Sequence, residues 1–140
     1  MRNHQKMRSG IEILADRPGD GPPIERRHVY RVRLRMWLNQ GEPIRWQSPW
    51  GLLDGSALGD GGHTLITCLR VDRRSMVNGL FYGTEGMRIG GTRKLKISPH
   101  LAYGDQGVAG VIPANAVLIA EIAFLEERLD PQSGHGDQTR

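Results

Sequence analysis

The sequence predicts an α+β fold in which one short helix covers a mostly antiparallel sheet of about five strands. Three observations lead to this prediction. Apolar residues alternate with other residues in several short segments, as in strands with one buried face. Only one segment, from Met76 to about Glu85, has apolar residues at helical spacing. The 19 glycines and 8 prolines indicate frequent turns between these segments.

The length of 140 residues suits one domain with one core. Hydrophobic residues make up 38% of the chain and charged residues 24%, which is ordinary globular usage and argues against disorder throughout. The two ends are polar and aperiodic. We therefore expect a disordered segment over residues 1–10, a folded domain over 11–128 and a disordered tail over 129–140.

The first half of the chain contains two expected strands and a long loop. Residues 11–16 alternate and precede a loop rich in Pro and Gly, which predicts a short edge strand. Residues 28–39 alternate cleanly and predict a long strand that covers the core. One face of this strand carries Tyr30, Val32, Leu34, Met36 and Leu38, and the other carries Arg31, Arg33, Arg35 and Trp37. Residues 44–64 predict a long loop with room for a bulged edge strand.

The second half contains the helix and three further strands. Residues 65–71 are apolar and β-branched and predict a strand. Ser75 is the expected cap of the helix, in which Gly79 and Gly83 each cost about 1 kcal/mol relative to Ala. Packing must therefore hold this helix. Residues 92–98 and 117–126 alternate and predict the last two strands, joined by a loop over 98–114.

Composition excludes several classes of site. Cys68 is the single cysteine, and the histidines lie too far apart to indicate a metal site. The basic N-terminus lacks the apolar run of a secretory signal, and no run approaches the length of about 20 residues that spans a bilayer. We expect a cytoplasmic protein with no metal, no cofactor and no membrane partner.

Residues 87–107 (MRIGGTRKLKISPHLAYGDQG) and 110–116 (GVIPANA) resemble the FKBP-type peptidyl-prolyl cis-trans isomerase family. In that family a methionine ends the helix, a glycine turn leads into a basic strand, and a Pro-x-x-Ala-Tyr-Gly segment begins a loop that overhangs the pocket. The good match covers Met76 to Glu126. It implies an isomerase whose partners are proline-containing clients, with a macrolide inhibitor as a further ligand.

The resemblance assigns roles to individual residues. Tyr103 would donate its hydroxyl to one substrate carbonyl, and the backbone N–H of Val77 would donate to another. Met76, Val77 and Leu80 would form the wall and floor, and Ile112 would cap the groove. Two alternatives stay open: Tyr103 bonded to a neighbouring carbonyl for stability, and the wall residues serving only as core.

The chain departs from the family at several pocket positions. Leu34, Ile44 and Ala120 stand where the family usually carries aromatic residues, and Arg45 stands where it carries an acidic one. Thr67 also aligns where an aromatic is expected, and Leu80 replaces a tryptophan. Trp46 and Trp50 are candidates to fill the vacated space. The alternative is that both pack on the outer sheet face beside Trp37.

Three functions therefore compete. The first is a working isomerase, and the second is a peptide-binding or chaperone-like module that has lost catalysis together with the aromatic walls. The third is a polyanion patch, although the net charge of +4 does not demand one. That patch would comprise Arg26, Arg27, Arg31, Arg33, Arg35, Lys94 and Lys96. We favour a solvated face for these charges and expect no nucleic acid partner, because no recognition helix accompanies them.

Overall fold

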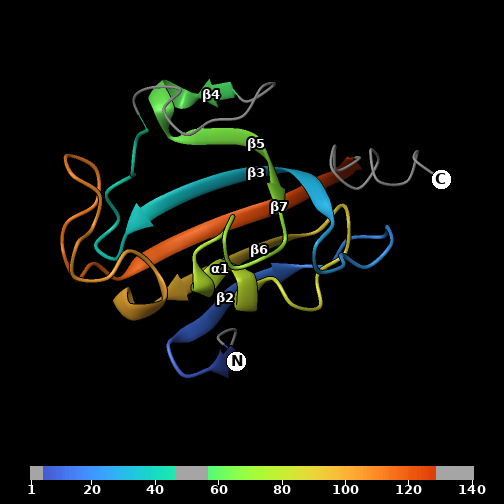
Figure 1. Cartoon of the computed structure of the whole chain (residues 1–140), viewed down its shortest axis with the longest axis horizontal. Coiled ribbons are helices and arrows are strands. Elements are labelled where there is room, and N and C mark those ends of the chain that lie inside the picture. The colour runs from blue at the N-terminus through green and yellow to red at the C-terminus, as the bar shows by residue number, and fades with distance from the viewer. Residues whose placement is uncertain (1–4, 47–56, 129–140) are drawn as a thin grey trace.

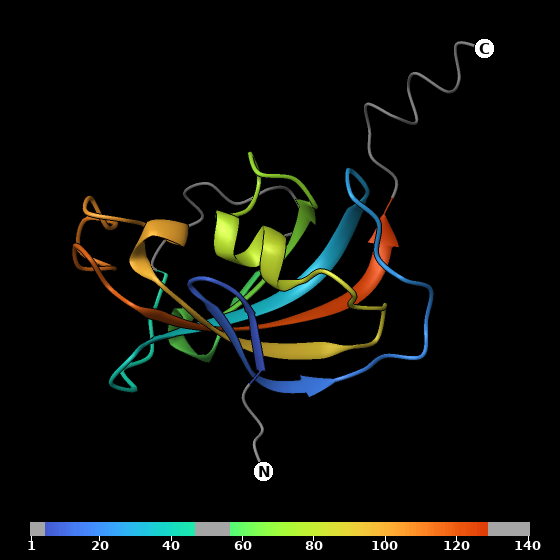
Figure 2. The same ribbon diagram turned by 90° about the horizontal axis from the view of Figure 1, so that it is seen from below.

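The computed structural model describes residues 5–46 and 57–128, which form a seven-stranded antiparallel sheet with one α-helix on one face (Figures 1 and 2). The strand order is β1-β2-β6-β7-β3-β5-β4. The strands are β1 (Gln5–Arg8), β2 (Ile11–Arg17), β3 (Val29–Leu38), β4 (Ala57–Gly59), β5 (Thr64–Arg70), β6 (Thr92–Ile97) and β7 (Leu118–Arg128). The helix is α1 (Asn78–Gly83), and two 3-10 turns are η1 (Asp60–Gly62) and η2 (Pro99–Leu101).

The predicted fold class is confirmed, and the sheet is larger than expected. The five expected strands correspond to β2, β3, β5, β6 and β7. The two additional strands, β1 and β4, are short and lie at opposite edges of the sheet. β4 is an edge strand within residues 44–64, where the sequence predicted a long loop with room for such a strand.

The N-terminus differs from the prediction. Residues Gln5–Arg8 were expected to be disordered, and they instead pair with β2, where Gln5 lies opposite Ile13 and Arg8 opposite Ile11. β2 is consequently an inner strand and not an edge strand. Residues 1–4 and the expected disordered tail over 129–140 lie outside the described residues.

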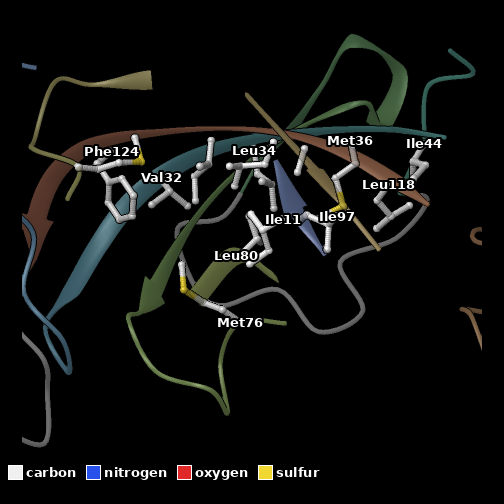
Figure 3. Close-up of a cluster of buried hydrophobic side chains, with 14 of the residues drawn as sticks. Ile11, Val32, Leu34, Met36, Ile44, Met76, Leu80, Ile97, Leu118 and Phe124 are labelled. Carbon is white, nitrogen blue, oxygen red and sulfur yellow. The ribbon is translucent and has the colours of Figure 1, made fainter. Parts of the chain in front are cut away.

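The core lies between the sheet and α1. β3 and β7 form the centre of the sheet, with Leu34 opposite Ile122 and Met36 opposite Ala120. Burial alternates along β3 as the sequence predicted, with its apolar face inward. Figure 3 shows side chains of β3 and β7 directed toward Met76 and Leu80 at the helix. One apolar cluster therefore joins the sheet to the start of α1.

The helix is shorter than predicted and starts differently. It spans Asn78–Gly83 rather than Met76 to Glu85, and its N-cap is Val77, which makes no side-chain cap hydrogen bond. The prediction that Ser75 caps the helix is wrong. The backbone N–H of Ser75 instead donates to Oδ1 of Asp72 at 2.8 Å, which forms a turn before the helix.

Close packing explains the glycines of α1. A Cβ on Gly79 would collide with Cγ2 of Ile97, and one on Gly83 would lie 2.6 Å from Cδ1 of Leu95. The helix therefore rests directly on β6, with its backbone against the side chains of that strand. The two glycines weaken the isolated helix, but the packing that they permit requires them.

A buried arginine fixes the other end of the helix. Arg93 of β6 is 7% exposed, and its Nη1 donates to the carbonyl oxygens of Gly83 at 2.9 Å and Glu85 at 2.8 Å. Its Nε donates to Oδ1 of Asp16 on β2 at 3.1 Å. These bonds satisfy carbonyls that the helix leaves unpaired at its C-terminal end. Arg93 thereby locks α1 in one position over the sheet.

Candidate functional site

The structure gathers the apolar members of the predicted lining in one place. They come from β3, the segment after it, α1 and the approach to it, the overhanging loop and β7. Each is at most 5% exposed and belongs to the same apolar cluster: Leu34, Ile44, Met76, Leu80, Ile112 and Ala120. Figure 3 shows several of these side chains between the sheet and the helix. These residues form a dense apolar floor.

Half-buried residues form the rim above this floor. Val77 and Tyr103 both pack against the cluster and remain partly exposed. Val108 and Val111 of the overhanging loop do the same. Sequence reasoning assigned the cap to Ile112, which is 3% exposed and lies deeper. It missed Val108 and Val111, because apolar residues between glycines in a loop give no periodic signal.

The overhanging loop is held by its own backbone. Gly104 donates to the carbonyl of Pro99 at 2.8 Å, and Gly107 donates to that of Tyr103 at 2.9 Å. Val108 and Ile112 exchange two backbone hydrogen bonds of 2.8 Å each. Gly107 has φ 61°, and a Cβ there would collide with the carbonyl oxygen of Ile112. The loop therefore presents Tyr103 in a fixed position.

The two expected hydrogen-bond donors have no protein acceptor in the described part of the chain. Within residues 5–46 and 57–128, no hydrogen bond uses the Tyr103 hydroxyl, which argues against a purely structural tie to a neighbouring carbonyl. Burial raises the pKa of Tyr103 above 10.0, so the hydroxyl keeps its proton. The Val77 carbonyl accepts from Leu80 and Phe81, whereas no bond among the same residues uses its N–H.

Of the early-loop residues singled out in the sequence, Trp46 joins the apolar cluster and Arg45 does not. Arg45 is exposed, and its Nη1 donates to the carbonyl oxygen of Asp60 at 2.7 Å. Trp46 is 9% exposed and belongs to the apolar cluster. Trp46 therefore packs on the core side of the sheet and not beside Trp37. This position is the one required if Trp46 fills space left by the missing aromatic residues. Trp50 lies outside the described residues.

The outer face of the sheet carries Trp37 and several cations. The ammonium of Lys94 lies 4.7 Å from the ring centroid of Trp37, and Arg35 contacts Glu121 at 3.1 Å. Arg26 does not join this face, because its guanidinium lies over the ring of Phe81 on α1. Figure 2 shows that α1 lies on one side of the sheet. The hypothetical polyanion patch is thus divided between the two sides of the sheet. No continuous patch of all seven cations exists.

A separate hollow of about 100 Å³ lies near the C-terminal end of α1. Its lining includes Asp16, Met87, Arg88 and Arg93. This volume is below the roughly 300 Å³ of the smallest ordinary ligand pockets. Arg93 is the one buried charge in this lining, and it already contacts Asp16 and two carbonyls. The hollow therefore belongs to the contacts that hold the C-terminal end of α1.

Other kinds of site find no support in the described ranges, 5–46 and 57–128. No group of three His, Cys, Asp or Glu side chains there is placed to hold a metal ion. No helix in those ranges is long and apolar enough to cross a membrane. Cys68 lies on β5, half-buried.

The sequence profile of the FKBP-type peptidyl-prolyl cis-trans isomerases matches residues 52–125. The Bos taurus peptidyl-prolyl cis-trans isomerase FKBP10 is 33% identical over 115 residues, which cover 78% of this chain and 19% of the bovine protein. The Neurospora crassa FK506-binding protein 1A is 51% identical over 51 residues, which cover 36% of this chain and 42% of the fungal protein. The match thus spans less than half of either relative.

Solved structures share the fold. A peptidyl-prolyl cis-trans isomerase from Pseudomonas syringae superposes with a TM-score of 0.68 at 20% identity, over 91% of this chain and 82% of the other. At this identity the likeness concerns the fold alone.

Proposed function

The chain belongs to the FKBP-type peptidyl-prolyl cis-trans isomerase family, and from that premise we propose that it isomerises Xaa-Pro bonds in peptides or folding proteins. The proposal concerns non-covalent catalysis. The bond rotates against a barrier of about 20 kcal/mol because amide resonance is lost, and lowering it requires no nucleophile, metal or cofactor. The twisted amide is less polar than the planar one, so a dry groove favours it.

The observation that carries this proposal is the pair of donors beside the apolar floor. The Tyr103 hydroxyl and the Val77 N–H both lie at the rim of the cluster that holds Met76 and Leu80. An apolar floor removes water from the proline, and two fixed donors orient the carbonyls on either side of it. The rigid backbone of the overhanging loop keeps the geometry ready before the client binds.

The substitution Tyr103→Phe tests the proposal. It removes one donor and keeps the ring, so we expect kcat/KM to fall about tenfold, as loss of one hydrogen bond in the transition state predicts. The measurement is a chymotrypsin-coupled assay on Xaa-Pro-Phe peptides, with thermal unfolding as the control for folding. Because the pKa of Tyr103 is raised, the wild-type rate should show no ionisation of this group below pH 10. An unchanged rate in Tyr103→Phe would refute the assignment.

A second candidate function is a peptide-binding or chaperone-like module without catalysis. The aliphatic floor at Leu34, Ile44 and Ala120 favours it, because these side chains supply less apolar area than aromatic ones. The absence of any rate above background, together with peptide binding, would select this function. FK506 is a useful competitor, since the fungal relative is named for binding it. We expect FK506 to compete weakly, because the aliphatic floor offers it less apolar area than aromatic residues would.

The same proposal includes a cytoplasmic location, which rests on the sequence alone. Localisation of a tagged full-length protein would test it.

A further inference from the structure

We propose that the clients of this site carry acidic residues close to the proline, and that four arginines beside α1 and the segment leading into it bind them. This inference rests on the proposed function, because it concerns the client of the same groove. The four are Arg26, Arg27, Arg73 and Arg74, called here the arginine cluster. All are exposed.

Two segments far apart in the sequence form the arginine cluster. Residues 24–28 precede β3 and residues 71–75 follow β5, and the two lie side by side (Figure 1). The N–H of Arg27 donates to the carbonyl of Val71 at 2.9 Å, and the N–H of Val71 donates to that of His28 at 3.0 Å. Nη1 of Arg70 donates to the carbonyl of Arg27 at 3.2 Å. The two segments that carry the cluster are therefore held together and are not two independent loops.

Contacts with α1 hold two of the guanidinium groups in place. Arg26 lies 4.9 Å above the ring centroid of Phe81, and Nη1 of Arg73 donates to the hydroxyl of Tyr82 at 3.4 Å. The rings of Phe81 and Tyr82 contact each other edge to face, 5.0 Å apart. An arginine positioned in this way loses less side-chain entropy when it binds a carboxylate. The arrangement favours a binding surface over freely solvated charges.

The nearby acidic groups do not neutralise the arginine cluster. Glu25 and Glu127 both lie next to His28, and Asp72 pairs with Arg70 at 3.6 Å. Among residues 5–46 and 57–128, no carboxylate lies within 4 Å of the cluster's guanidinium groups. Four positive charges therefore remain available to a partner from outside.

Two members of the cluster directly precede residues of the candidate site in the chain. Arg73 and Arg74 directly precede Ser75, and the next residues are Met76 and Val77, of which one lies in the floor and the other carries the expected donor N–H. An extended client rises about 3.3 Å per residue, so a carboxylate a few positions from the proline reaches the arginines. Arg45 adds positive charge on the early-loop side, where it is exposed. Arginine binds carboxylates through two parallel hydrogen bonds, which fits Asp or Glu in the client.

The aromatic rings beside the arginine cluster favour a protein client over nucleic acid. Single-stranded nucleic acids bind to open aromatic faces on which bases stack. Here Arg26 covers a face of the Phe81 ring, and the Tyr82 ring contacts that ring edge to face. The surface offers fixed guanidinium groups in place of a stacking platform, which suits acidic side chains.

The test uses three labelled peptides with an identical Ala-Leu-Pro-Phe core and flanks of Glu, Gln or Lys on both sides. Fluorescence anisotropy measures binding to the full chain at low and physiological ionic strength, and NMR exchange measures isomerisation of the same peptides. Two exposed ion pairs contribute about 0.2–1 kcal/mol each, so we expect the Glu peptide to bind about fivefold more tightly than the Gln peptide. The Lys peptide should bind more weakly than either, and salt should reduce the difference.

The variant R73Q/R74Q should reduce the preference for Glu over Gln below twofold, measured as the ratio of the two dissociation constants of the variant. The matched control is R33Q/K96Q, which removes the same charge from β3 and β6, where no ion pair among the described residues uses either side chain. The control should keep the fivefold preference. Equal losses in the two double variants would show a general charge effect and overturn the inference.

Failure of this inference can be told apart from failure of the proposed function. Equal binding and isomerisation of all three peptides would remove the acidic preference and leave the isomerase intact. A preference for Glu that R73Q/R74Q removes, without any isomerisation, would keep the client assignment and refute the enzyme. A single-stranded oligonucleotide that displaces the Glu peptide and binds more tightly would assign the surface to nucleic acid and overturn the inference.

Discussion

The two ends of α1 are held in different ways. At the C-terminal end, buried Arg93 donates to the carbonyls of Gly83 and Glu85 and contacts Asp16. At the N-terminal end, Val77 caps the helix without a side-chain hydrogen bond, and its N–H faces no acceptor among the described residues. Stabilising polar contacts gather at one end, and open donors lie at the other. The closed end thus positions the helix, and the open end carries the donor to which the proposed function assigns a client carbonyl.

The largest expected effect comes from breaking the closed end with Arg93→Met. The substitution leaves the two carbonyls and the carboxylate of Asp16 without their donor, while the methionine keeps an unbranched side chain. We expect the free energy of unfolding to fall by about 3 kcal/mol. Urea denaturation measures it. A loss below about 0.5 kcal/mol would show that Arg93 does not hold the helix.

A smaller loss should follow from Gly79→Ala, which pushes the helix away from β6. The added Cβ meets Cγ2 of Ile97, and such overpacking costs about 1–3 kcal/mol. Gly59→Ala is the matched control, because its Cβ would meet only Cβ of Thr64 at 3.7 Å. Urea denaturation of the two variants should differ by more than 1 kcal/mol. Equal stabilities would contradict the close packing of α1 on β6.

The smallest effect concerns Asp72, in the turn before the open end. Partial burial acts to raise the pKa of Asp72, but hydrogen bonds from Ser75 and Arg74 and the charge of Arg70 outweigh it and hold the pKa below 3.8. A carboxylate with a lowered pKa stabilises the fold above its unfolded pKa, and this contribution disappears as pH falls through the folded value.

The measurement for Asp72 is urea denaturation of the wild type and Asp72→Asn between pH 7 and pH 2. We expect a difference of about 1 kcal/mol at neutral pH that vanishes in acid. A difference that persists at pH 2 would mean that the turn does not depend on the ionised carboxylate.

The sequence predicted the parts of the fold that repeat a pattern. Alternation along β3 identified its inner face, and the alternation expected over residues 92–98 agrees with the burial of every second residue of β6, Arg93 included. Alternation could not reveal that Arg93 contacts Asp16, because that residue lies 77 positions away in the chain. The short strands β1 and β4 were harder to predict, since three or four residues are too few to show a period.

The candidate site was predicted less evenly. The resemblance selected Met76, Leu80 and Ile112, and the structure brings them into one cluster. The roles of Tyr103 and Val77 stay predictions, supported by donors that meet no acceptor in the described residues. The arginine cluster could not be read from the sequence, because it forms only where residues 24–28 meet residues 71–75.

The most direct test of the open end is an NMR titration of the ¹⁵N-labelled chain with a short proline peptide. We predict that the amide signal of Val77 and the ring signals of Tyr103 shift with one common affinity, while the Nε–H signal of Arg93 stays in place. A titration that moves Arg93 and the residues of the hollow, with Val77 and Tyr103 unaffected, would contradict the account.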